Sequence, residues 1–222
     1  MPPEPIPEMP YPAARPLIRS GDLLLFRSAG IRGKALRVAG RGEYTHAAKA
    51  VWWYPPLGSP IGDAILFVCE TIEGVGGRLI PLSRYVAEYP GEIEVFSINC
   101  RSFPEYDCAK ACEWMLRNIP GVKYGSLSLL RIALSHLPFI RWIVRPSTDN
   151  VSQSGRKPVC SAAVAKADRL GGGVDPVPGR SDDWCEPSEL ARSLLYRRKF
   201  RLLPDGRDAE GNRQDARESQ DG

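Results

Sequence analysis

Two histidines, His46 and His136, and six cysteines are the side chains best suited to nucleophilic or metal chemistry in this sequence. His46 lies in the segment Tyr-Thr-His-Ala-Ala-Lys-Ala-Val-Trp-Trp, which is typical of a buried strand. Because side chains alternate along a strand, His46 would share a face with Ala48 and Ala50. These small residues would let another element approach the imidazole. Alone, a strand histidine is more often structural, so a catalytic role requires a partner.

Cys160 is the candidate partner. It lies in Arg-Lys-Pro-Val-Cys-Ser-Ala-Ala-Val-Ala, where Pro158 favours the start of a helix and Cys160 falls in its first turn. Unpaired N–H groups and the helix dipole stabilise a thiolate there. Beside a histidine cation such a thiol titrates far below its usual value of about 8.5. The small residues that follow would let the helix pack closely on the sheet. The alternative is a buried structural cysteine.

A third group is needed to orient the imidazole. Glu70 ends the apolar run Ala-Ile-Leu-Phe-Val-Cys-Glu-Thr, where a carboxylate is unexpected. If this strand pairs with the strand of His46, Glu70 would accept a hydrogen bond from the distal imidazole nitrogen. A strand-end glutamate that turns to solvent is the alternative, and Asp63 and Glu73 are weaker substitutes.

The cysteine spacing argues against a metal site. The sequence has no Cys-x-x-Cys motif, and Cys108 and Cys112 have no second pair nearby. One helical turn apart on an apolar stripe, these two cysteines are expected to act as small hydrophobic residues. We therefore expect no metal, no cofactor and free thiols, and a zinc-dependent enzyme is the least favoured class.

Strand patterns come early in the sequence and helix patterns come late. Apolar or alternating runs predict strands at 22–26, 44–53, 64–71, 93–98 and 200–203. Amphipathic patterns predict helices over 102–119, beginning with the capping box of Ser102 and Glu105, and over 159–170 and 187–197. This order predicts an α+β fold in which an antiparallel sheet packs against helices.

The 222 residues suffice for one sizeable domain. Residues 1–16 are rich in proline and are expected to form an extended arm. Residues 17–203 form the expected domain. Residues 204–222 are charged and lack large apolar side chains, so we predict a disordered tail.

Charge and hydropathy limit the expected partners. The net charge of +4 is mild, so no nucleic acid is expected. The basic cluster Tyr196-Arg-Arg-Lys199 is interpreted as a helix C-terminus. Charged residues and Pro138 interrupt the apolar stretch 127–144, which falls short of a membrane span. A buried helix is favoured there, and contact of 126–144 with a membrane surface is the alternative.

The first residues do not have the pattern of a signal peptide, so a cytoplasmic location is expected. Carriage in a phage virion and non-classical export are the alternatives. The oligomeric state is left open.

Several short motifs, in their order along the chain, resemble the permuted NlpC-type papain-like superfamily. The YiiX/YebB-like branch of cysteine hydrolases is the most similar, and lecithin–retinol acyltransferases are more distant. The motifs are Gly21-Asp22-Leu-Leu-Leu-Phe, Tyr44-Thr-His46-Ala-Ala, Val68-Cys-Glu70-Thr, Gly77-Arg-Leu-Ile-Pro-Leu82, Val122-Lys-Tyr124-Gly, Val159-Cys160-Ser161-Ala and Cys185-Glu-Pro-Ser-Glu-Leu190. Gly125 departs from the acidic residue usual in this branch, and 126–144 is an elaboration.

The resemblance implies a permuted papain-like fold with the nucleophile Cys160 at a helix N-terminus, His46 as its base and Glu70 as the third member. It also makes Asp22, Tyr124 and Ser161 the candidate substrate-binding residues. The implied activity is that of a cysteine peptidase or amidase, acting on a peptide or a peptidoglycan fragment through a thioester. An acyltransferase or lipase on lipid esters, and a non-catalytic virion or envelope binding module on the same fold, are the alternatives.

Overall fold

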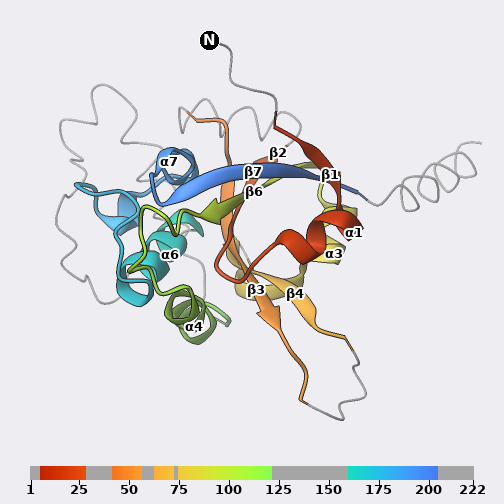
Figure 1. Cartoon of the computed structure of the whole chain (residues 1–222), viewed down its shortest axis with the longest axis horizontal. Coiled ribbons are helices and arrows are strands. Elements are labelled where there is room, and N and C mark those ends of the chain that lie inside the picture. Colours follow the sequence, from red (N-terminus) through yellow and green to blue (C-terminus); the bar gives the residue numbers. More distant parts are fainter. Residues whose placement is uncertain (1–5, 29–41, 57–62, 73–74, 122–159, 205–222) are drawn as a thin grey trace, which may run out of the picture.

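A computed structural model of the chain describes residues 6–28, 42–56, 63–72, 75–121 and 160–204. Its centre is one seven-stranded sheet with helices on both faces (Figure 1). The predicted α+β class is therefore confirmed. The segment 126–144 and nearly all of the tail 204–222 lie outside the described residues, so the predictions for both stay predictions.

The strands are ordered β1-β7-β6-β2-β3-β4-β5 across the sheet. Every pairing is antiparallel except that of β1 with β7, which is parallel. The strand bounds are β1 Glu8–Pro10, β2 Leu23–Ser28, β3 His46–Trp53, β4 Ile65–Ile72, β5 Gly76–Pro81, β6 Gly91–Ile98 and β7 Tyr196–Leu203. The sheet contains the five predicted strands and adds β1 and β5.

Helices divide between the two faces of this sheet. The helices are α1 Tyr11–Ala14, α3 Leu82–Glu88, α4 Cys108–Asn118, α6 Cys160–Lys166 and α7 Pro187–Arg192, and a π-helical turn, Ala167–Gly171, continues α6. In Figure 1, α1 and α3 lie to the right of the central strands, and α4 and α6 lie to the left. Each face therefore buries its own set of apolar side chains.

The helix of Cys160 covers the face opposite to the one expected. Val164 and Ala165 of α6 pack in a cluster with Ala47 of β3. Ala48 and Ala50 instead pack in a cluster with side chains of α1 and α3. The expectation that Ala48 and Ala50 receive this helix was therefore wrong. Alternation along β3 turns the two sets of alanines to opposite faces.

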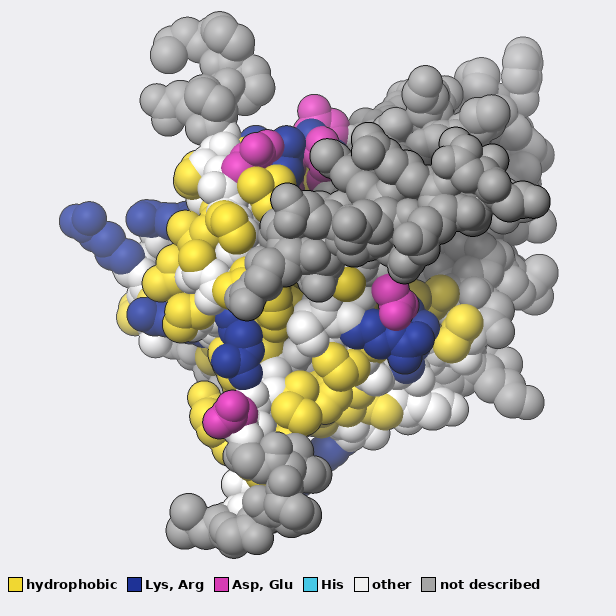
Figure 2. Space-filling model, turned by 90° about the vertical axis from the view of Figure 1, so that its right-hand side faces the viewer, with side chains coloured by type: hydrophobic (Ala, Val, Ile, Leu, Met, Phe, Trp, Pro, Cys, Tyr) yellow, Lys and Arg dark blue, Asp and Glu magenta, His cyan; other side chains and the backbone are white. Residues whose placement is uncertain are grey.

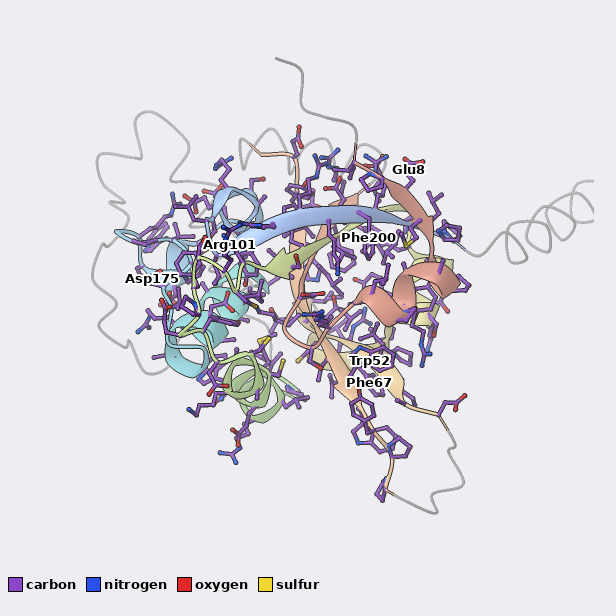
Figure 3. The ribbon with its side chains drawn as sticks, in the orientation of Figure 1. Glu8, Trp52, Phe67, Arg101, Asp175 and Phe200 are labelled. Carbon is purple, nitrogen blue, oxygen red and sulfur yellow. The ribbon has the colours of Figure 1, made fainter. Side chains whose placement is uncertain are left out.

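Part of the proline-rich start belongs to the domain and is not an extended arm. Residues 8–10 form β1 on the edge of the sheet, and the side chains of Tyr11 and Ala14 are buried. Glu8 and Phe200, both labelled in Figure 3, belong to the two strands that meet at this edge. A segment with several prolines forms an edge strand because an edge strand has fewer N–H groups to satisfy.

Two further predictions about element boundaries were wrong. Helix α4 begins at Cys108, where Asp107 caps it by accepting from the backbone N–H of Lys110 at 3.0 Å, so Ser102 and Glu105 do not form its cap. The basic cluster 196–199 lies on β7 and not at a helix end. Tyr196 and Phe200 of this strand are buried. In so short a segment, tertiary packing decides between strand and helix.

A buried lysine joins the strands to the turn that follows α6. Lys49 of β3 is fully buried, and its Nζ lies 2.6 Å from Oδ1 of Asp168, 2.8 Å from the Tyr196 hydroxyl and 2.9 Å from the carbonyl oxygen of Gly21. Tyr106 and Tyr196 both donate to Asp168. Every charge in the group is thus paired, and the group fixes the element that carries Cys160 against β3.

Candidate active site

His46 is the first residue of β3 and lies opposite Phe26 of β2. The two rings are 5.0 Å apart between centroids and tilted by 52°. The imidazole is 16% exposed, so it reaches the surface at the end of a buried strand. This position lets a group from outside the sheet meet the ring.

Glu70 of β4 meets His46 across the adjacent strand pair. Val68 lies opposite Ala50, and from there β4 runs back toward the start of β3, because the two strands are antiparallel. Glu70 therefore lies on the same face of the sheet as His46, with its Oε2 2.6 Å from Nε2 of the imidazole. Its side chain is completely buried. The strand pairing expected for Glu70 is the one that the structure contains.

Cys160 is the first residue of α6 and is 7% exposed. Its thiol interacts electrostatically with the His46 side chain, and the backbone at Ala47 and Ser161 also stabilises its charged form. Because Glu70 contacts Nε2 of the imidazole, Nδ1 is the ring nitrogen that remains for Cys160. Three side chains from β3, β4 and α6 thus form the series Cys160–His46–Glu70.

The charges of this series support one another. Burial alone would raise the pKa of the Cys160 thiol, but the His46 cation and the hydrogen bonds to the sulfur lower it below its usual value. Burial alone would lower the pKa of His46, but its charge and hydrogen-bond interactions with Cys160 and Glu70 raise it to about 10. The arrangement favours a thiolate beside an imidazolium, which is the reactive form of a nucleophilic cysteine.

Glu70 remains ionised although it is buried. Burial raises the pKa of its carboxyl group, but hydrogen bonds and opposite charge from His46 and Arg78 lower it. The Nε of Arg78 lies 2.8 Å from Oε1 of Glu70. A charged carboxylate at this position stabilises the imidazolium.

The three candidate substrate-binding residues have different positions. Asp22 precedes β2 at the end remote from Phe26, about 13 Å along the strand, and its carboxylate accepts from the N–H of Arg19 at 2.9 Å. The Ser161 hydroxyl is buried and donates to the carbonyl oxygen of Cys185 at 2.5 Å. The structure thus brings neither side chain to the thiol. Tyr124 lies outside the described residues.

Arg78 and Tyr85 contact Glu70 and were not among the predicted site residues. Arg78 lies directly opposite Glu70 in the β4–β5 pair, and Tyr85 of α3 interacts electrostatically with the same carboxylate. The signal available in the sequence was the Gly-Val-Gly-Gly segment, 74–77, which indicates a hairpin that would place Arg78 beside Glu70.

Within the described ranges, no group of three or more His, Cys, Asp or Glu side chains is arranged to hold a metal ion. In the same ranges, no helix has the length and apolar character that a bilayer crossing requires. On the face shown in Figure 2, hydrophobic side chains gather in patches left of centre and at the lower centre, with Lys and Arg side chains beside them.

Comparison with known proteins identifies a similar solved structure. No protein-family profile matches the chain, and no curated protein matches its sequence. The crystal structure of a metalloprotein, yiiX, from Escherichia coli O157:H7 is similar with a TM-score of 0.47 and 15% identity, covering 84% of this chain and 99% of that one. A likeness of this extent does not establish a family, so the function proposed below depends on the geometry of the chain itself.

Proposed function

We propose that this chain is a cysteine hydrolase that cleaves an amide bond through a thioester intermediate. One observation carries the proposal: Cys160, His46 and Glu70 lie together in one site, with 2.6 Å between Oε2 of Glu70 and Nε2 of the imidazole and a charge interaction between His46 and Cys160. A nucleophile, its base and an orienting carboxylate in this order are the requirements for acyl transfer by a thiol.

In the first half of the reaction, the Cys160 thiolate attacks the substrate carbonyl carbon and forms a C–S bond. The backbone N–H of Cys160, in the first turn of α6, is a donor for the resulting oxyanion. When the C–N bond breaks, the His46 imidazolium transfers its proton to the leaving amine. The product of this half is an acyl thioester on Cys160.

In the second half, neutral His46 removes a proton from water, and the hydroxide attacks the thioester carbonyl. The C–S bond then breaks, the acid product leaves, and the proton held on His46 restores the thiolate–imidazolium pair. Glu70 stays ionised and hydrogen-bonded to Nε2 throughout, which stabilises the imidazolium whenever it forms.

The chain order of these residues supports a permuted papain-like arrangement. His46 and Glu70 come first, on adjacent strands, and Cys160 comes last, on a helix. This is the order that the motif resemblance implies for the NlpC-type permuted branch. The same resemblance supports a peptide-type amide as the substrate, with peptidoglycan fragments as the class to test first.

The test measures hydrolysis of muropeptides and of short-chain esters by the wild type, Cys160→Ala and His46→Ala. Arg84→Gln, on an exposed side chain of α3, is the matched control. We expect both site variants to lose at least about 10³-fold in kcat/KM, because nucleophile and base act as one unit. Muropeptide cleavage supports the amidase, and cleavage of esters alone favours the acyltransferase or lipase. Equal activity in all four proteins would refute the proposal.

A thiol assay separates the enzyme from a non-catalytic binding module. We expect Cys160 to be alkylated by iodoacetamide near pH 6 and to lose this reactivity in His46→Ala, because the imidazolium stabilises the thiolate. Alkylation that begins only at the pH of an ordinary thiol, about 8.5, would favour the binding module.

A further inference from the structure

The carboxylate of Glu70 has a different partner on each oxygen. Oε2 lies 2.6 Å from Nε2 of His46, and Oε1 lies 2.8 Å from Nε of Arg78. The Glu70 side chain has no exposed surface, so water does not take the place of either partner. The contact on Oε1 therefore decides how the carboxylate is turned toward the imidazole.

Arg78 and Tyr85 reach this carboxylate from elements that follow one another in the chain. Arg78 lies opposite Glu70 in the β4–β5 pair, so its side chain is on the same face of the sheet. Tyr85 lies on α3, which begins directly after β5, and it interacts electrostatically with the Glu70 carboxylate. The Arg78 guanidinium lies over the Tyr85 ring, 5.9 Å from its centroid. The three side chains form a closed group.

The same tyrosine is also linked to His46 through an aromatic contact. The Tyr85 ring lies 5.0 Å from Phe26, and Phe26 lies 5.0 Å from the His46 ring. Tyr85 thus interacts with Glu70 on one side and packs on Phe26, which packs on the imidazole, on the other. Burial and the charge of Glu70 raise the pKa of Tyr85, so its hydroxyl remains a hydrogen-bond donor at neutral pH.

The charge of Arg78 does not by itself favour the reactive pair. A cation on the carboxylate repels the imidazolium, so a purely electrostatic role would lower the proton affinity of His46. Arg78 must therefore favour the pair through Glu70. Without Arg78, the buried Glu70 carboxylate would lose a hydrogen-bond donor and a positive charge that offset the cost of removing it from water. One-third of the Arg78 side chain is exposed, so it remains charged at little cost.

We propose that Arg78, together with Tyr85, is a positioning residue of the site: it holds the Glu70 carboxylate ionised and turned toward Nε2 of His46. This inference rests on the proposed function, because it assigns Arg78 a part in forming the thiolate–imidazolium pair. Arg78 itself touches neither the thiol nor the substrate in this role.

The test is the pH dependence of iodoacetamide alkylation at Cys160, read by mass spectrometry of the Cys160 peptide. The variants are Arg78→Gln, Arg78→Lys and Tyr85→Phe. Arg84→Gln is the control, because Arg84 pairs with Glu88 on the exposed side of α3. A change that only loosens the fold would lower the melting temperature but would not displace the acid limb of the profile.

We expect Arg78→Gln to move the acid limb of alkylation up by about one pH unit, which is a tenfold loss of rate near pH 6. Arg78→Lys should recover only part of this loss, since an ammonium lacks the planar fork that serves Glu70 and Tyr85 together. Tyr85→Phe keeps the ring and should give a smaller shift in the same direction. It is informative even if Arg78 variants fold poorly.

Profiles of Arg78→Gln and Tyr85→Phe that coincide with those of the wild type and Arg84→Gln would overturn the positioning role. The proposed function would then stand, provided that the wild type still reacts near pH 6 and His46→Ala does not. Full recovery in Arg78→Lys would overturn the orienting part of the role, because a positive charge beside Glu70 would then suffice. A wild-type thiol that is inert near pH 6 would remove both proposals.

Discussion

At the scale of residues, the site depends on pairing groups that burial would otherwise neutralise. Cys160, His46 and Glu70 are all largely buried, and burial alone would favour the uncharged form of each. Their mutual contacts outweigh this effect and favour the charged form of all three groups. The titration of each group therefore depends on the charges of the others. The pair of Cys160 and His46 is therefore expected to gain and lose protons as a unit.

The pH dependence of kcat/KM should follow from these shifts. The acid limb should lie at a lower pH than the usual pKa of a thiol, because the pKa of Cys160 is lowered. The alkaline limb should appear near pH 10, where His46 loses the proton that the leaving group needs. A single rise near pH 8.5 with no alkaline fall, on the substrate found by the hydrolysis test, would contradict this assignment.

Replacing Glu70 with Gln should narrow that profile from both sides. The amide keeps the shape of the side chain but removes the negative charge that helps to raise the pKa of His46. The alkaline limb should therefore move down, and the acid limb of Cys160 alkylation should move up by at least about one pH unit. Glu88→Gln is the control on an exposed glutamate. An unchanged profile in Glu70→Gln would exclude Glu70 from the series.

At the scale of elements, the nucleophile depends on how α6 and the turn after it are held on β3. Lys49 of β3 and Asp168 of the turn are both fully buried, and their charged atoms lie 2.6 Å apart. The hydroxyls of Tyr106 and Tyr196 also donate hydrogen bonds to the Asp168 carboxylate. This group lies one turn beyond the residues of α6 that pack on Ala47.

Asp168→Asn should destabilise the protein by about 3–5 kcal/mol, because it leaves the Lys49 ammonium buried without a counter-charge. Urea unfolding followed by fluorescence measures the change. Glu113→Gln is the matched control, since its pair with Arg117 is exposed and contributes little. If Asp168→Asn unfolds at the same urea concentration as the control, the pair does not hold α6 in place.

At the scale of the whole molecule, the N-terminal segment completes one core. Residues 8–10 extend the sheet beyond β7, and Tyr11 and Ala14 pack in the cluster that also contains Ala48 and Ala50. The face of the sheet that carries His46 and Glu70 is therefore covered by segments from the start of the chain and from α3 (Figure 1). Loss of this cover would expose the core next to the site.

Tyr11→Ala should lower the free energy of unfolding by about 3 kcal/mol, because it empties a buried aromatic position. The control is Tyr54→Ala, which removes a tyrosine that is 71% exposed. The two variants are compared by thermal and urea unfolding. Equal stability of both would mean that the first residues are an arm, as the proline content alone suggests.

The sequence by itself determined five of the seven strands of the sheet, and it singled out Cys160, His46 and Glu70 as the candidate reactive side chains. Alternation and apolar runs reflect local burial, and these three residues stand out as reactive types within or beside apolar elements. Local patterns contain this information because side-chain periodicity follows backbone geometry.

Only the tertiary structure decided which face α6 covers, where Asp22 and Ser161 point, and that Arg78 and Tyr85 complete the surroundings of Glu70. The alanines of β3 are small on both faces, so their pattern does not choose between them; the packing of α1 and α3 does. Arg78 meets Glu70 through the register of a strand pair, and register depends on contacts between segments that periodicity within one segment does not contain.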